Sequence, residues 1–187
     1  MYTHAPQNIF ARLRLRPYVS SDAAHIVSWC RSEFAFRQWC ADFFDHYPLL
    51  PMEFESYARA LDNNPRSFVM TGCLGQTVIG SVSLRYPRDT DDTVRLGFVI
   101  LDPAYRGLGL GKKLVQAAAR YAFDYLDARR VTLGVFENNP SAHHCYLQAG
   151  FRPNAKEPVF YCAIMGEEWT QYELECMRPT DPAADTL

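Results

Sequence analysis

The stretch that decides this fold runs Leu101-Asp-Pro-Ala-Tyr-Arg-Gly-Leu-Gly-Leu-Gly-Lys-Lys113, where an apolar segment meets a glycine-rich turn. Residues 94–101 are apolar and β-branched, which predicts a buried strand closed by Asp102-Pro103. After the turn, apolar residues recur at helical spacing with polar residues between them, which predicts an amphipathic helix. The stretch therefore predicts a strand, a tight turn and a helix in succession.

The turn carries little side-chain bulk, because glycine stands at Gly107, Gly109 and Gly111. The first N–H groups of a helix have no partner within it and lie at the positive end of its dipole. Such a turn is a site for an anion, most naturally a phosphate. The nucleotide P-loop pattern does not fit, and the dinucleotide fingerprint fails because Lys112 and Leu114 stand where it requires glycine.

The spacing that does fit begins at Arg106, with glycine three and five positions later at Gly109 and Gly111. This spacing resembles the pyrophosphate-binding signature of the GNAT N-acetyltransferase superfamily, and the resemblance includes the preceding strand and Asp102-Pro103. The alternative is a glycine-rich connection between strand and helix that binds no ligand.

A second motif lies at Asn139-Pro-Ser-Ala-His-His-Cys-Tyr-Leu-Gln-Ala-Gly-Phe151. Asn139 predicts an N-cap with proline at the first helical position, and Gly150 predicts the end of that helix. With Tyr146 and Phe151 at this spacing, the segment resembles the later motif of the same superfamily. Alternatively, Tyr146 is a core tyrosine on an inward helical face. The resemblance covers nearly the whole chain and extends to ribosomal-protein N-acetyltransferases.

The remaining patterns predict an α/β (α+β) fold with a mixed sheet and helices on both faces. Strands are predicted at 9–16, 67–73, 78–86, 94–101, 130–136, 158–165 and 169–177, and helices after 22, at 54–61, after 111 and at 140–149. The order β-α-α-β-β-β-α-β-α-β-β matches the GNAT acyl-CoA N-acyltransferase fold that the resemblance implies. We expect a single domain over residues 1–187, with a structured core at 9–178 and a frayed tail at 179–187.

Composition narrows the function classes. The chain has 187 residues, is 48% hydrophobic and 21% charged, and has a formal net charge of −2. These values are typical of one globular domain and argue against general nucleic-acid binding. The sequence has neither a signal-peptide pattern nor an apolar run near the ~20 residues of a membrane helix, so we expect a cytoplasmic protein without membrane contact. Its 6 cysteines are scattered, which predicts free thiols and no metal site.

The resemblance implies transfer of an acetyl group from the co-substrate acetyl-CoA to a primary amine by direct attack. The cofactor-binding residues that it implies are Phe98, Val99, Ile100, Leu101, Arg106, Gly107, Leu108, Gly109, Leu110, Gly111, Lys112, Asn139 and Tyr146. Residues 98–101 would pair with the pantetheine arm and polarise the thioester carbonyl, and the N–H groups of 106–111 would hold the pyrophosphate. Lys112 would add charge or lie in solvent, Asn139 would contact the pantetheine arm, and Tyr146 would protonate the departing sulfur as general acid.

The resemblance fails at one position. Many members have a glutamate two residues before the strand glycine, usable as a general base, but here Arg95 stands two residues before Gly97. The general base is therefore unassigned. The nearby candidates are Glu137, Asp89, Asp91, Asp92, His143 and His144. An acceptor with a low-pKa amine, such as a protein α-amino group, would need no base.

The acceptor site in such folds is formed by the first helices and the last strand pair, here the aromatic segment 29–47 and residues 160–169. Those aromatic residues either wall a pocket or simply form core. The acidic residues that would favour a cationic acceptor are Asp42, Asp45, Glu53 and Glu55. The acceptor is left open between a small-molecule amine and a protein N-terminus or lysine, and the alternative function is a non-catalytic acyl-CoA-binding sensor. Since relatives often dimerise, a homodimer is a further expectation.

Overall fold

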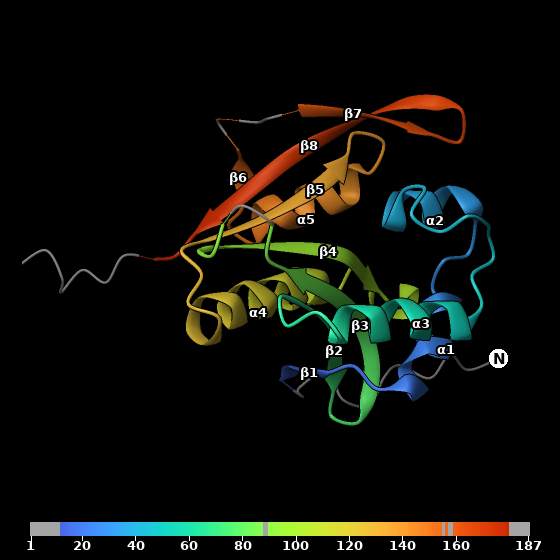
Figure 1. The fold of residues 1–187 in the computed structure, drawn as a ribbon, viewed down its shortest axis with the longest axis horizontal. Coiled ribbons are helices and arrows are strands. Elements are labelled where there is room, and N and C mark those ends of the chain that lie inside the picture. The colour runs from blue at the N-terminus through green and yellow to red at the C-terminus, as the bar shows by residue number, and fades with distance from the viewer. Residues whose placement is uncertain (1–11, 88–89, 155, 157–158, 180–187) are drawn as a thin grey trace, which may run out of the picture.

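The computed structural model describes residues 12–87, 90–154, 156 and 159–179. In this part of the chain, 8 strands form one sheet in the order β1-β2-β3-β4-β5-β8-β6, and β7 also pairs with β8 (Figure 1). The strands are β1 (Leu13–Pro17), β2 (Ser67–Leu74), β3 (Thr77–Arg85), β4 (Thr93–Leu101), β5 (Arg130–Phe136), β6 (Arg152–Pro153), β7 (Val159–Ile164) and β8 (Glu167–Met177). The helices are α1 (Ala23–Ser28), α2 (Glu33–Cys40), α3 (Pro51–Asp62), α4 (Leu110–Tyr125) and α5 (Pro140–Gln148), with 3-10 turns at Ser20–Asp22 and Pro103–Tyr105.

The predicted mixed sheet is confirmed: β4 and β5 are parallel neighbours, and the other paired strands are antiparallel. The structure adds α2 and β6 to the predicted order. Helix α2 lies inside the aromatic segment and begins with a local signal, because the Ser32 hydroxyl accepts the Ala35 N–H at 3.2 Å. The predicted strand residues 9–11 and the predicted tail from residue 180 lie outside the described residues.

Helices cover both faces of the sheet. α4 and α5 pack on one face, over a core that includes Val82, Leu96 and Leu133. The helices α1, α2 and α3 gather at one end of the other face, around Val69 and Ile100 (Figure 1). Because side chains alternate along a strand, each central strand contributes to both cores.

Helix α4 docks closely on β2 and β3 because two glycines face it. Gly72 and Gly80 are paired across the two strands. A Cβ at Gly72 or Gly80 would lie 2.6 Å or 2.8 Å from a Leu114 methyl group. This close approach fixes the start of α4, and with it the glycine-rich turn.

Strand β4 contains a bulge next to this turn. One β3 residue, Val82, lies opposite two β4 residues, Phe98 and Val99. Phe98 has a φ of 46°, in the left-handed region that side-chain-bearing residues seldom adopt. As a result, Phe98 joins the core under α1–α3, whereas Val99 packs against the α4–α5 core.

The parallel strands separate just before the bulge. Residues 93–95 of β4 pair with residues 130–132 of β5, and the pairing then stops. Beyond these pairs, the carboxyl ends of both strands diverge. The resulting gap opens beside the turn that begins α4.

Candidate active site

A cavity of about 630 Å³ occupies the gap between β4 and β5. Its walls come from the α1–α2 region, the ends of β4 and β5, the glycine-rich turn, and α5. It is lined by every predicted cofactor-binding residue except Leu108 and Leu110. Leu108 is 50% exposed, and Leu110 packs against Leu74 and Ile79 in a small separate core. The structure thus brings two distant sequence motifs to one cavity.

The glycine-rich turn gives this cavity an anion-binding end. Gly107 and Gly109 have φ values of 75° and 71°, and a Cβ at either would meet nothing within 4 Å. Gly109 is the N-cap of α4 and provides no side-chain cap, so the first N–H groups of the helix remain available. Open space, free amides and the helix dipole together fit a pyrophosphate.

Two other residues of the turn have structural contacts. A Cβ at Gly111 would lie 3.2 Å from the Cys145 sulfur, so this glycine allows α4 and α5 to approach each other. The Arg106 amide donates to the Pro103 carbonyl at 3.3 Å, and its guanidinium donates to the Leu101 carbonyl at 3.2 Å. The Arg106 amide is therefore already engaged within the protein, unlike the amides that follow it in the prediction.

Helix α5 places the second motif on the same cavity. The Asn139 side chain accepts the Ala142 N–H at 3.2 Å, which confirms the predicted N-cap. Tyr146 lines one side of the cavity and is buried in the core shared by α4 and α5. Burial raises the pKa of the Tyr146 hydroxyl, and Cys145 beside it adds to the rise. Tyr146 is consequently protonated at neutral pH and can act as a donor.

An aromatic cluster adjoins the cavity on the other face of the sheet. The Phe98 ring lies 5.5 Å from Trp39, 5.3 Å from Phe43 and 4.9 Å from Tyr57, between ring centroids. Phe43 is nevertheless 61% exposed. These rings are therefore partly core and partly an accessible wall, and Trp39 and Phe98 line the cavity directly.

Helix α2 crosses the gap. Gln38 on α2 donates through Nε2 to the Asn138 carbonyl at 2.6 Å, just beyond the end of β5. The ring of Phe34, also on α2, lies 5.2 Å from Trp169 on β8. These two contacts tie the β4 side of the cavity to its β5–β8 side. The sequence did not predict this connection.

The arginine that replaces the family glutamate is held in an ion pair. Both terminal nitrogens of Arg95 donate to Glu173, at 2.5 Å and 2.6 Å, and Gln171 donates to the same carboxylate at 2.7 Å. Glu173 is only 4% exposed. The pair spans β5 above Gly134, where a Cβ would lie 2.9 Å from Arg95 Nη2. A lone glycine in a β-branched strand was the one sequence signal of this crossing.

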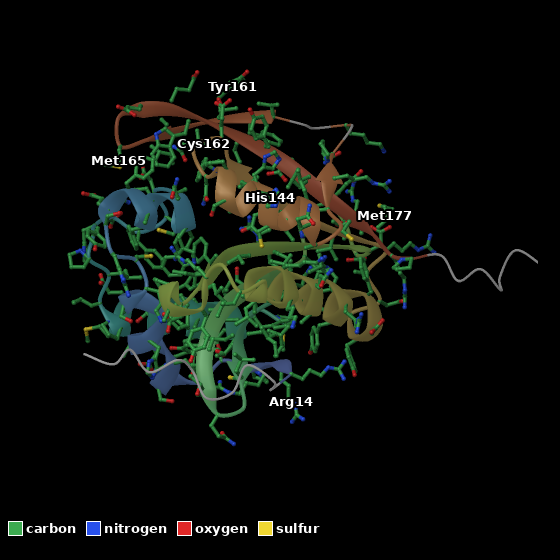
Figure 2. The ribbon with its side chains drawn as sticks, turned by 180° about the vertical axis from the view of Figure 1, so that it is seen from behind. Arg14, His144, Tyr161, Cys162, Met165 and Met177 are labelled. Atoms are coloured by element: carbon green, nitrogen blue, oxygen red, sulfur yellow. The ribbon has the colours of Figure 1, made fainter. Side chains whose placement is uncertain are left out.

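Of the candidate bases in the described part of the chain, only His144 lines the cavity. Asp91 and Asp92 precede β4 and lie at the end opposite the gap, and Asp89 lies outside the described residues. Glu137 is exposed and accepts the Tyr172 hydroxyl at 2.8 Å. His143 stacks on Tyr172, whereas His144 lines the cavity from α5. Figure 2 shows His144 on α5, with Tyr161, Cys162 and Met165 along the β7–β8 hairpin.

Most of the acidic residues expected to attract a cation have other contacts. Asp42 lies 3.3 Å from the Arg37 guanidinium. Glu53 accepts the Leu50 N–H at 2.8 Å and lies 2.9 Å from His46. Glu55 accepts from Ser20 and Arg59. Of the four acidic residues, only Asp45 has no such contact among the described residues.

The fold and this cavity define the protein class. Residues 27–151 match the model of the Acetyltransferase (GNAT) family, and the chain therefore belongs to that family. Its members use acetyl-CoA as co-substrate, and the open glycine-rich end of the cavity fits the pyrophosphate of that molecule.

Relatives and solved structures refine the comparison. The spermine/spermidine N(1)-acetyltransferase of Bacillus subtilis strain 168 is 36% identical over 56 residues, which cover 30% of this chain and 37% of that relative. A spermidine N-acetyltransferase from Vibrio cholerae, solved with CoA and spermine, has a TM-score of 0.74 at 22% identity, covering 89% of this chain and 95% of that one. A putative phosphinothricin N-acetyltransferase has a TM-score of 0.69 at 22% identity, covering 90% and 99%. The two solved structures establish the fold.

No helix among the described residues has the length and hydropathy of a membrane span. Nor do they contain a group of three or more His, Cys, Asp or Glu side chains arranged to hold a metal ion.

Proposed function

We propose that this protein transfers the acetyl group of acetyl-CoA to a primary amine. The observation that carries the proposal is the gap between β4 and β5, which joins an anion-binding turn at one end to Tyr146 and the Phe98 bulge farther in. A long cofactor with a phosphate-rich end and a reactive thioester end matches that arrangement. Acetyl-CoA supplies the activated acyl group.

The residues have distinct roles in this reaction. The amides after Arg106 bind the pyrophosphate, while residues 98–101 and Asn139 hold the pantetheine arm. An amide at the β4 bulge polarises the thioester carbonyl as the amine nitrogen attacks its carbon. The new C–N bond forms as the C–S bond breaks, the amine loses one proton, and the sulfur gains one. Tyr146 donates to that sulfur, and its raised pKa keeps it protonated until the sulfur departs.

A small-molecule amine is the favoured acceptor. Helix α2 ties the two sides of the cavity together through Gln38 and Phe34, which narrows the approach to the thioester end. A protein N-terminus would need an open groove there. The Bacillus subtilis relative named above acts on spermine and spermidine, which also supports a small amine. The narrower resemblance to ribosomal-protein N-acetyltransferases stays a prediction, as do the cytoplasmic location, the homodimer and the lack of nucleic-acid partners.

The test is release of free CoA thiol from acetyl-CoA with a panel of small amines and N-terminal peptides. We expect release with at least one small amine. Tight acetyl-CoA binding without thiol release for any acceptor would favour the non-catalytic acyl-CoA-binding sensor. The presence of Arg95 in place of the family glutamate also supports that alternative. Failure to bind acetyl-CoA in calorimetry would contradict the proposal altogether.

A further inference from the structure

A second arginine lies next to Arg95 on the acceptor face of the sheet. Arg85 of β3 pairs with Arg95, and Ser83 pairs with Gly97 one step closer to the bulge. Strand alternation places Ser83 and Arg85 on the same face, about 7 Å apart along the strand. The Tyr57 ring contacts the Phe98 ring. Burial raises the pKa of the Tyr57 hydroxyl, and the nearby Ser83 and Arg85 both act to lower it. A strip of hydroxyls and guanidinium groups therefore leads away from the thioester end.

Arg85 differs from Arg95 in its contacts with carboxylates. Glu173 binds Arg95 through both carboxylate oxygens and also accepts a hydrogen bond from Gln171. Among the described residues, Arg85 has no hydrogen-bonded acidic partner. Desolvation lowers the pKa of the Arg85 guanidinium and the positive charge of Arg95 lowers it further, whereas the nearby Tyr57 and Glu173 raise it; the residue as a whole is exposed. An exposed guanidinium with no hydrogen-bonded carboxylate can form a charge-assisted pair with an anion that reaches it.

The cavity is poorly suited to a polycation. No described residue that lines it is an aspartate or glutamate. Its arginine and lysine, Arg106 and Lys112, both lie at the glycine-rich end that fits the pyrophosphate. Nearby on α2, Glu33 and the neighbouring Asp42 are both within 3.3 Å of Arg37. Arg85 is outside the lining of the cavity, but it lies on the same face of the sheet as the aromatic rings around Phe98.

We infer that the acceptor is a small amine that also has a carboxylate, an amino acid or a related zwitterion, and that Arg85 binds this carboxylate. The apolar part of the acceptor lies against the accessible wall formed by Phe43, Tyr57 and Phe98. Its amino group then points along the strip toward the β4 bulge. This inference rests on the proposed acetyl transfer and names the substrate class for the same site.

The first test compares matched acceptors in the thiol-release assay with the full-length protein. The panel contains aliphatic and aromatic L-amino acids, their amides, the corresponding decarboxylated amines, and spermidine. We expect at least one amino acid to have a kcat/KM about tenfold to a hundredfold above that of its amide, as charge-assisted hydrogen bonds are worth ~1.5–3 kcal/mol. Spermidine is expected to be a poorer acceptor than that amino acid.

The second test changes the arginine. Arg85→Gln should remove the preference for the carboxylate by raising KM, while the amide is turned over as in the wild type. Arg85→Lys should restore part of the preference, because it keeps the charge but not the paired hydrogen bonds. Arg120→Gln is the matched control, since Arg120 is exposed on α4 on the other face of the sheet. Calorimetric titration of the best amino acid into the enzyme with CoA should show the same losses without relying on turnover.

The outcomes separate this inference from the proposed function. Turnover of amides, plain amines or spermidine at least as fast as amino acids would overturn the carboxylate inference and leave acetyl transfer intact. An unchanged preference in Arg85→Gln would overturn the role of Arg85. No thiol release with any member of the panel would overturn both.

Discussion

The two ends of the cavity are proposed to bind their ligands by different means. The cofactor end is made of backbone: the amides that follow Arg106, with open space above Gly107 and Gly109. The proposed acceptor end depends on side chains from separate elements: the Phe98 ring on β4, which lines the cavity, and the Arg85 guanidinium on the neighbouring strand β3. A backbone site tolerates exchange of nearby side chains but fails when its space is filled. A side-chain site changes its ligand with single substitutions, so the second end is where specificity is set.

The largest expected effect comes from filling the backbone site. In Gly109→Glu, the new carboxylate would occupy the anion-binding space and repel the pyrophosphate, so calorimetry should detect no acetyl-CoA binding. Gly166→Glu is the control: Gly166 also has a positive φ, of 77°, and open space around it, but lies in the β7–β8 turn. Equal affinity in both variants would contradict the placement of the pyrophosphate.

The next largest effect concerns catalysis at the junction of the two ends. Tyr146→Phe removes the proton donor, and kcat should fall by about a hundredfold to ten-thousandfold with acetyl-CoA affinity unchanged. Tyr125→Phe, at an exposed position on the same α4–α5 side, should retain wild-type kcat. If kcat for Tyr146→Phe equals that of wild type, Tyr146 is a core tyrosine only.

The buried ion pair is expected to matter for stability on the acceptor side. Arg95→Met would leave Glu173 buried without its cation, and the free energy of unfolding in urea should fall by about 3–5 kcal/mol. Adding Glu173→Met should recover most of that loss, because the unpaired charge is then gone. A double variant as unstable as Arg95→Met would show that the pair is not the cause.

The smallest effect should come from the α2 connection. Gln38→Leu removes the hydrogen bond to Asn138, worth about 0.5–1.5 kcal/mol, so the acceptor KM should rise about two- to tenfold. Acetyl-CoA affinity should not change. Gln116→Leu on the exposed side of α4 is the control. A change in acetyl-CoA affinity alone would contradict this prediction, because it would show that α2 acts at the cofactor end of the cavity.

The cofactor end was largely predictable because its signals are local. The glycine spacing and the Asn139 cap each depend on only a few neighbouring residues in the sequence. The structure places both on one cavity. Local spacing says less about other details. Gly111 lines the cavity but also allows α5 to approach α4, and Asp91 precedes β4, at the end away from the cavity.

The acceptor end was not predictable for a physical reason. The Arg95–Glu173 pair joins residues 78 positions apart, and the Gln38–Asn138 contact joins residues 100 positions apart. Neither contact produces a periodicity or a spacing in the sequence. The direction of Phe98 likewise depends on a bulge set by the pairing of β3 with β4. Such features follow only from the assembled sheet.

The most direct test of acetyl transfer in this cavity is the stoichiometry of the wild-type reaction. Acetyl-CoA and the best acceptor are mixed with the enzyme, and released CoA thiol is compared with N-acetylated acceptor measured by mass spectrometry. We expect equal amounts of the two products, with negligible thiol release when the acceptor is omitted. Thiol release that is independent of the acceptor, or an acceptor that remains unacetylated, would contradict this expectation.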